Sequence, residues 1–553
     1  MDKTEITENK EIVKEQSAID SSQVLLKGAT ILAAAGIVSK IFGAIFRIPL
    51  TNMIGAEGQS YYTVSYNIYS LLFVIATAGF PVAISRMVSS RIAEKDYINA
   101  HKSYSLAMKF SAALGVISFM ILFFGAGAIA NAYHIPGAEP SIRALSLALL
   151  ITPIVASLRG YYQGRQEMMP TAVTEVVEQM VRVAVGLSLA YMLYKTSLER
   201  AAAGATFGAS VGITAAFAVM IIIYLRDKKQ RDAMFSDSIR RDEDDKSRFK
   251  ELISFLIPIT ISSAVMPIMF NIDSAIVVRR LMATGWDRTM SEKLYGLMGG
   301  FCDPIINLPN IFIDAICISL MPAVTAAFTL ANKKALDEHL RTGLKTMMII
   351  AYPCTIGLIV LARPILTLLF FKKYDEALLA VPTMRILALS IVTTAIMRTF
   401  SVSLQGIGKM MLPVWNLIIG AIVKIAVSYV LLGVHAVHVN GAAIGSVCAY
   451  ITAGILNYRA LRKYADISLD VKGVFIKPLA ASLLMGAATI AVYKGAFAAT
   501  GSNLVSVAVS IMIAVIVYFV SVFKTRAISR EEMQLIPKGD LIYDMAVKLK
   551  IAE

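Results

Sequence analysis

Two cations lie inside the first apolar segment of the chain. The stretch Gly36–Leu50 reads GIVSKIFGAIFRIPL and contains Lys40 and Arg47. A spacing of seven residues is about two helical turns, so both side chains project from one face of a helix. A charge at the bilayer centre costs roughly 2.5–3.5 kcal/mol on insertion scales. Because the segment holds no acid, it indicates a site for an anion, and Arg grips phosphate oxygens with two hydrogen bonds.

Other polar side chains recur in the apolar segments at spacings of three and four residues, which place them on one helix face. Glu178 and Arg182 predict an i,i+4 pair that is either structural or functional. Arg86 follows Pro81 and either joins the anion site or marks the cytoplasmic boundary. The candidate substrate-binding residues are Lys40, Arg47, Arg86, Asp303, Asn307, Asn310, Asp314 and Arg398. The candidate charge pairs or coupling residues are Glu175, Glu178, Arg182, Asp273 and Lys424.

Lys424 lies in an apolar segment, VWNLIIGAIVKIAVSYVLL, that contains no carboxylate. A lone lysine in hydrocarbon must find a partner on another helix or lose its proton. Asp273 is the nearest plausible partner, so we predict a contact between the two side chains. The alternative is that Lys424 faces a wet central cavity and adds to a field that attracts anions.

The elements that carry these residues are membrane-spanning helices. The chain has 553 residues, of which 57% are hydrophobic and only 16% are charged. Runs of about 20 apolar residues, each able to cross roughly 30 Å of hydrocarbon, recur throughout. The net charge of +15 fits cytoplasmic loops under the positive-inside rule and does not indicate nucleic acid. We expect an all-α polytopic protein with fourteen spans, at about 28–52, 61–88, 105–132, 142–163, 170–194, 201–225, 251–281, 294–328, 344–371, 379–405, 413–435, 439–461, 474–497 and 502–523.

Short motifs repeat in the same order in two halves of the chain. YYQGRQEMMP at 161–170 is echoed by SLQGIGKMMLP at 403–413, an offset of 242 that also relates Arg182 to Lys424. GATFG at 204–208 is echoed by GAAIG at 441–445, and small-xxx-small spacing predicts close helix packing. An even number of spans per half gives a parallel repeat, with a substrate site between the halves. The expected parts are a cytoplasmic N-terminal tail (1–27), a six-helix lobe (28–225), a charged cytoplasmic linker (226–250), a second six-helix lobe (251–461), two extra helices (474–523) and a cytoplasmic tail (524–553).

Motifs for catalysis and for metal binding are absent from the sequence. No GxxxxGK[ST] or HExxH occurs, and the four cysteines lie in apolar segments. The acidic run at 242–244 is interpreted as solvated linker, and His435 with His438 are too few ligands for a metal. We therefore expect no catalytic residue, no metal and no cofactor, and a protein that is not an enzyme.

Three segments resemble the polysaccharide-flippase family of the MOP exporter superfamily, which includes stage V sporulation protein B, YtgP and MurJ-like lipid II flippases. They are GATILAAAGIVSKIFGAIFRIPLTNMIG, YNIYSLLFVIATAGFPVAISRMVS and YGLMGGFCDPIINLPNIFIDAICISLMPAVTAAF, within a resemblance that spans residues 28–523. It implies two lobes in a V, with two extra helices that form a lipid-tail groove. It also implies that Lys40 and Arg47 stand near family arginines, whereas Phe73 and Pro304 replace two others.

The resemblance implies a flippase for an undecaprenyl-pyrophosphate-linked cell-wall sugar precursor, lipid II above all, that works by alternating access. The alternatives are a flippase for another lipid-linked polysaccharide precursor and a cation-coupled drug antiporter of the MATE type. A drug antiporter for cations would need carboxylates where the first helix carries Lys40 and Arg47. The expected partners are the lipid-linked sugar pyrophosphate, membrane lipid and a coupling ion, sodium or proton, or the membrane potential. We expect a monomer in the bacterial plasma membrane with both termini cytoplasmic.

Overall fold

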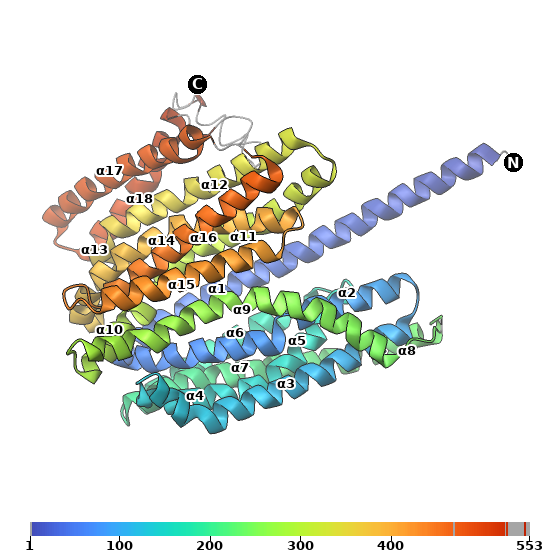
Figure 1. The fold of residues 1–553 in the computed structure, drawn as a ribbon, viewed down its shortest axis with the longest axis horizontal. Helices are drawn as coiled ribbons and strands as arrows, with labels where there is room; N and C mark the ends of the chain where they lie inside the picture. The colour runs from blue at the N-terminus through green and yellow to red at the C-terminus, as the bar shows by residue number, and fades with distance from the viewer. Residues whose placement is uncertain (1–2, 240, 468–469, 526, 529–546, 549–553) are drawn as a thin grey trace. The chain divides into compact units, whose positions relative to one another are not determined.

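Every regular element in the part of the chain that the structure describes is a helix (Figure 1). The structure, a computed structural model, describes residues 3–239, 241–467, 470–525, 527–528 and 547–548, so most of the expected tail 524–553 lies outside it. The α-helices are α1 (Lys3–Thr77), α2 (Phe80–Ala93), α3 (Tyr97–Ala132), α4 (Glu139–Ser146), α5 (Ala148–Gly164), α6 (Met169–Tyr194), α7 (Leu198–Arg226), α8 (Lys228–Ser236), α9 (Asp245–Ala283), α10 (Arg288–Gly296), α11 (Asp303–Thr329), α12 (Lys333–Val360), α13 (Ala362–Leu369), α14 (Tyr374–Gly406), α15 (Met411–Leu432), α16 (Asn440–Ala465), α17 (Lys477–Thr500) and α18 (Asn503–Lys524). Short turns η1 (Pro136–Ala138) and η3 (Phe371–Lys373) are 3₁₀-helical, and η2 (Leu297–Cys302) and η4 (Lys472–Ile476) are π-helical. The predicted all-α polytopic fold is confirmed.

Thirteen helices in the described residues are long and apolar enough to cross a membrane, and the first contains two of the fourteen expected spans. This first stretch, Thr30–Ala93, has 64 residues. At about 1.5 Å per residue it would be about 96 Å long, three times the thickness of the hydrocarbon layer. Gly55 divides it, because its φ of 64° and ψ of −168° are not helical and suit a residue without Cβ. A second break after Thr77 precedes Pro81 in the first turn of α2, as Pro81 predicts.

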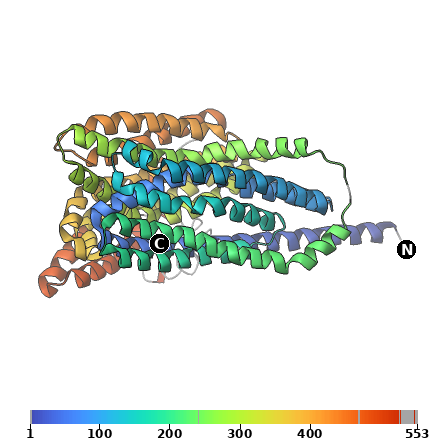
Figure 2. The same cartoon turned by 90° about the horizontal axis from the view of Figure 1, so that it is seen from below.

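The chain forms two compact units that are each built from discontinuous segments. Unit 1 comprises Met1–Phe46, Ser65–Asn131 and Pro136–Ile268, and unit 2 comprises Arg47–Val64, Ala132–Ile135 and Met269–Glu553. Within each unit the long helices run roughly along a common direction (Figure 2). The six-helix lobes expected at 28–225 and 251–461 stay a prediction.

Glycines let α6 pack closely on α7 in unit 1, and α15 on α16 in unit 2. A Cβ at Gly208 would lie 2.5 Å from the Cα of Gly186 and 2.8 Å from the carbonyl oxygen of Arg182. A Cβ at Gly445 would lie 3.2 Å from the carbonyl oxygen of Lys424. Arg182 and Lys424 are the residues that the repeat offset relates, so the same contact recurs in both halves. The predicted packing role of these glycines is confirmed.

The linker after α7 is held to unit 1 by two buried arginines. Arg91 of α2 donates from Nε to Glu243 over 3.0 Å and from Nη2 to Glu243 and to Glu251, the latter over 2.7 Å. Arg248 donates to Glu243 over 3.3 Å and to Asn99 over 2.8 Å. The interpretation of the 242–244 run as solvated linker is therefore wrong for Glu243, because two guanidiniums on neighbouring helices draw its carboxylate inward.

Replacing Gly208 by valine will destabilise unit 1, because the new side chain must displace backbone atoms of α6. We expect a fall in the thermal unfolding temperature of the detergent-solubilised protein, from an overpacking cost of about 1–3 kcal/mol or more. The matched control is Ala218→Val, an exposed position on the same helix. Equal unfolding temperatures for the two variants would contradict the close packing.

Acid will weaken the link between Glu243 and the two arginines. Burial raises the pKa of Glu243, but the hydrogen bonds and charges of Arg91 and Arg248 outweigh burial and hold that pKa below its usual value. The stabilisation is thus present above the unfolded pKa of about 4.3 and is lost as pH falls through the lowered folded pKa. Glu243→Gln should cost about 1–2 kcal/mol at neutral pH, reduced from the value for a buried pair because the carboxylate is partly exposed.

The check is the unfolding temperature as a function of pH between neutrality and pH 3. The wild type should lose more stability than Glu243→Gln over the acid range. The exposed neighbour Asp242 provides the control variant, Asp242→Asn, which should follow the wild type. Parallel curves for the wild type and Glu243→Gln would show that the pair contributes nothing.

Candidate functional site

Arg47 binds the backbone of the π-helical turn η2 within unit 2. Its Nη1 donates to the carbonyl oxygen of Gly299 over 2.8 Å, and its guanidinium lies 5.0 Å from the ring centre of Tyr62. Thr51, one turn along α1, donates to the carbonyl oxygen of Gly300 over 3.1 Å. A π turn replaces i→i+4 bonds by i→i+5 bonds and so changes which carbonyls are available. Arg47 thus has structural partners in η2, and its positive charge also attracts the carboxylate of Asp303.

Close contact between α1 and η2 requires glycine. A Cβ at Gly299 would lie 2.5 Å from Oγ1 of Thr63, and a Cβ at Gly300 would lie 2.5 Å from Cγ of Gln59. Side chains at these two positions would push α1 away from η2 and would separate Arg47 from its acceptor. The GLMGG sequence at 296–300 therefore allows the close approach that positions the guanidinium of Arg47.

Lys40 lies on an open face of α1 in unit 1. Its side chain is exposed, and a Cβ at Gly36 or at Gly43 would meet no atom within 4 Å. These three residues follow at spacings of four and three, so they share one helix face. The exposed ammonium of Lys40 is therefore accessible from this face of the helix.

Three further candidates lie on α11 near Arg398 of α14. Asp314 and Arg398 form an ion pair in which about a third of each side chain is exposed. Asn310 donates from Nδ2 to Oδ1 of Asn307 over 3.4 Å, one turn earlier on α11. These residues of unit 2 thus form a polar face that includes both signs of charge. Asp303 begins α11 and is half-buried.

The charged residues of α6 have partners from other segments of unit 1. Glu178 pairs with Arg159 of α5 over 3.0 Å. Arg182 donates to the hydroxyl of Tyr66 over 3.4 Å and lies over the rings of Tyr66 and Phe46. The pair of Glu178 with Arg182 stays a prediction.

Glu175 and Arg86 occupy separate environments in unit 1. Glu175 is half-buried on the helix that carries Glu178. Arg86 is exposed, and its guanidinium lies 4.3 Å from the ring centre of Phe255 in α9. A cation over an aromatic face is a modest stabilising contact, which leaves the N–H groups of Arg86 able to bind an anion.

The predicted contact between Asp273 and Lys424 is confirmed within unit 2. Lys424 Nζ of α15 lies 2.6 Å from Asp273 Oδ2 of α9, and both side chains are buried. The same nitrogen donates to the carbonyl oxygen of Met269 over 3.1 Å. The ammonium therefore holds two helices of unit 2 together across an apolar interior.

Residues that sequence patterns did not single out complete the polar interior. Asn457 of α16 accepts from Asn416 of α15 over 2.8 Å and donates to Ser401 of α14 over 2.9 Å. Arg159 is another such residue. A single polar side chain in an apolar segment is the signal that could have found each of them.

Unit 2 contains an apolar groove that is bounded by α11, α12, α17 and α18. Its volume is about 570 Å³, within the range of roughly 300–1,000 Å³ that is typical of ligand pockets. Gly357 of α12 opens the groove, since a Cβ there would meet no atom within 4 Å. The opposite wall includes Val515 and Tyr518 of α18. The two C-terminal helices thus build one side of a site for a long apolar group.

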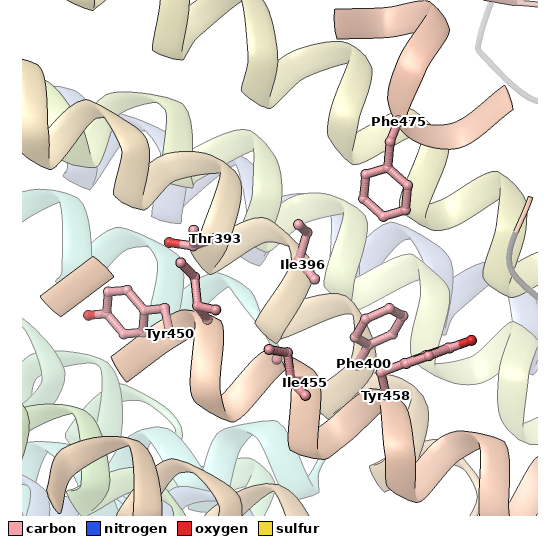
Figure 3. A pocket seen from close by; sticks show the side chains of 9 residues that line it. Thr393, Ile396, Phe400, Tyr450, Ile455, Tyr458 and Phe475 are labelled. Carbon is pink, nitrogen blue, oxygen red and sulfur yellow. The ribbon is translucent and has the colours of Figure 1, made fainter. Parts of the chain in front are cut away.

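A second apolar pocket lies between α14, α16 and η4 (Figure 3). The rings of Phe400 and Tyr458 pack together at 5.6 Å on one side, and Phe475 stands across from them. Its volume of about 180 Å³ is below the usual range of ligand pockets. We therefore retain the larger groove as the candidate site for an apolar ligand.

Metal-ligating side chains do not gather anywhere in the described residues: no group of three or more His, Cys, Asp or Glu is placed to hold an ion. His435 stacks on Trp286, with ring centres 4.4 Å apart and planes 9° apart. All four cysteines are free. The chemistry available at the candidate sites is thus ionic and apolar binding.

Comparisons with known proteins agree with this architecture. The family model described as "Polysaccharide biosynthesis protein" matches residues 25–328, and a second one, described as "MatE", matches residues 298–430. The chain is 27% identical over 466 residues to "Lipid II flippase MurJ" of Bacillus subtilis (strain 168), covering 81% of this chain and 85% of that protein. It is 24% identical over 524 residues to "Stage V sporulation protein B" of the same organism, covering 94% and 98%.

Two solved structures show the same fold. A structure of lipid II flippase MurJ in an inward closed conformation has a TM-score of 0.64 at 16% identity, covering 89% of this chain and 98% of that one. An inward-facing MATE family transporter of the MOP superfamily has a TM-score of 0.66 at 15% identity, covering 77% and 94%. The family match extends over more than half of the residues, so this multi-pass membrane protein belongs to the polysaccharide biosynthesis protein family and has the fold of the MOP superfamily.

Proposed function

We propose that the protein is a flippase that moves a lipid-linked sugar pyrophosphate from the inner to the outer leaflet of the bacterial plasma membrane. Undecaprenyl-pyrophosphate-linked cell-wall precursors are the substrate class, and lipid II is the favoured member because of the similarity to MurJ. The protein works as a monomer by alternating access, with both termini in the cytoplasm. It carries its substrate unchanged and is not an enzyme.

The observation that carries this proposal is the apolar groove. A drug-like cation needs a compact pocket with a carboxylate, whereas a prenyl tail needs a long surface without polar groups. The groove of about 570 Å³ has apolar walls from α11 and α12 and is closed by α17 and α18. Burial of hydrocarbon there is worth about 0.8 kcal/mol for each CH₂. The groove therefore supports a substrate with a hydrocarbon tail.

The charges of α1 support an anionic head group on the same substrate. Lys40 is exposed and already bears the sign that a pyrophosphate requires. Arg47 is partly committed to Gly299, but its fork of N–H groups has further donors for phosphate oxygens. Lys40 is thus the residue that we propose as the head-group ligand, with Arg47 as a secondary one.

The MATE-like fold keeps drug antiport as the competing function, because solved MATE structures share the architecture at low identity. The two functions differ in what proteoliposomes transport. A flippase moves fluorescent lipid II or another undecaprenyl-pyrophosphate sugar between leaflets, and an antiporter moves a cationic dye. Equal flipping of two different sugar head groups would favour the broader precursor class over lipid II.

Lys40→Ala will slow flipping, because it removes the positive charge that we propose as the ligand of the head group. Loss of a hydrogen bond between charged groups costs about 1.5–3 kcal/mol, which is about a 10- to 150-fold loss of affinity for the head group. The measurement is the leaflet exchange of fluorescent lipid II in proteoliposomes. Lys40→Arg is the matched control and should retain activity. Arg47→Ala should lower both activity and stability, and full activity of Lys40→Ala would contradict the assignment.

Gly357→Leu will obstruct the groove without disturbing the fold. The leucine side chain enters open space, and leucine in a helix is more stable than glycine by roughly 0.5–1 kcal/mol. Flipping should fall, with the largest effect on substrates with long prenyl tails. Gly495→Leu on α17 is the control, since that glycine also faces open space but does not line the groove. Similar flipping rates for the two variants would show that the tail binds elsewhere.

A further inference from the structure

Asp273 and Lys424 form a carboxylate–ammonium pair in the apolar interior of unit 2. The exposed fraction is 6% for Asp273 and 2% for Lys424. A carboxylate in such a place needs a positive partner, because burial of an unpaired charge costs several kcal/mol. Transporters meet this need with Na⁺, with a proton or with a basic side chain. Whether the positive partner of the carboxylate is an ion or a basic side chain decides which ions this site needs.

Two oxygen atoms of α9 contact the ammonium of Lys424. Asp273 contributes Oδ2 at 2.6 Å, and the carbonyl oxygen of Met269, one turn earlier on α9, lies at 3.1 Å. Asp273 Oδ1 is buried, and in the described structure it has no hydrogen-bond partner. A carboxylate and a carbonyl are oxygen ligands that hard cations prefer.

A metal cation does not fit among these oxygens while Lys424 is present. The ammonium nitrogen fills the space between the carboxylate of Asp273 and the carbonyl of Met269. A monovalent ion bound to the other carboxylate oxygen would lie beside a second positive charge. Two like charges about 4 Å apart repel by about 4 kcal/mol at an effective dielectric constant of 20. These residues thus suit the ammonium of Lys424 as a permanent cation and disfavour the binding of an exchangeable metal ion.

We propose that Lys424 is the built-in counter-cation of Asp273, so that this site of the protein binds no Na⁺ and needs none. The side chain supplies the positive charge that a bound monovalent ion would otherwise supply. The proposal concerns ion binding and goes beyond the flippase function, which holds or fails independently of it.

Deletion of the ammonium should convert the site into one that binds Na⁺. Lys424→Ala leaves Asp273 and the Met269 carbonyl without their cation. A ligand that binds only the folded state stabilises it in proportion to its concentration. The unfolding temperature of detergent-solubilised Lys424→Ala should therefore rise in NaCl relative to choline chloride of equal ionic strength, by about 2–4 °C. The wild type should give equal values in both salts.

Two further variants make the result specific. Lys424→Ala combined with Asp273→Asn removes both charges, so its unfolding temperature should be the same in the two salts. Should Lys424→Ala not fold in either salt, Lys424→Asn is measured in the same way, because its amide replaces the hydrogen bonds and adds an oxygen. Folding of either single variant in NaCl but not in choline chloride also supports the proposal.

The proposal is overturned by a Na⁺-specific rise in the wild type that disappears in Asp273→Asn. It is equally overturned if the single variants that fold give the same unfolding temperature in both salts. These measurements require no transported lipid. A failed flipping assay would therefore count against the proposed function alone.

Discussion

An ionic side chain in an apolar helix must exchange its water for a partner, and this requirement joins three pairs of helices within the two units. Asp273 and Lys424 join α9 to α15, Asp314 and Arg398 join α11 to α14, and Arg159 and Glu178 join α5 to α6. Removal of one member of a buried pair would leave a costly unpaired charge, so both members are needed to hold the two helices in place. The side chain of Lys40, by contrast, is exposed. Ionic contacts between helices thus hold the interior of each unit together.

Close backbone approach is the second condition for this arrangement. Glycines at 208 and 445 bring α7 onto α6 and α16 onto α15, and the glycines of η2 bring α1 onto the π turn. Without a hydrophobic force between helices in lipid, contact area and backbone hydrogen bonds must supply the attraction. The carbonyl of Gly299 becomes an acceptor for Arg47 in this way. A glycine that permits close approach and a charged residue that bonds to the backbone there therefore act together, although neither residue on its own predicts the contact.

Periodicity and composition were sufficient to predict the helical fold, the packing glycines and the Asp273–Lys424 contact. The helical fold and the packing glycines follow from local sequence patterns. The contact follows because the helix of Lys424 carries no acid, so the partner of Lys424 must lie on another helix. The contact of Glu178 with Arg159 was not predictable, because Arg159 comes close only when α5 packs on α6. The ion pairs of Glu243 and the π turn also depend on tertiary contacts, which no spacing within one segment encodes.

The hydrogen bond between Arg47 and Gly299 joins residues 252 positions apart in the chain. At a synthesis rate of about 5–20 residues per second, the acceptor is made about 13–50 s after the donor. During that interval the first helix is already at the membrane, and its guanidinium must remain hydrated at the interface or be sheltered by the insertion machinery. The final depth of the first helix is therefore set only after the eighth expected span emerges from the ribosome. Synthesis of the first helix thus precedes formation of its contact with η2, an order of events that the finished structure does not show.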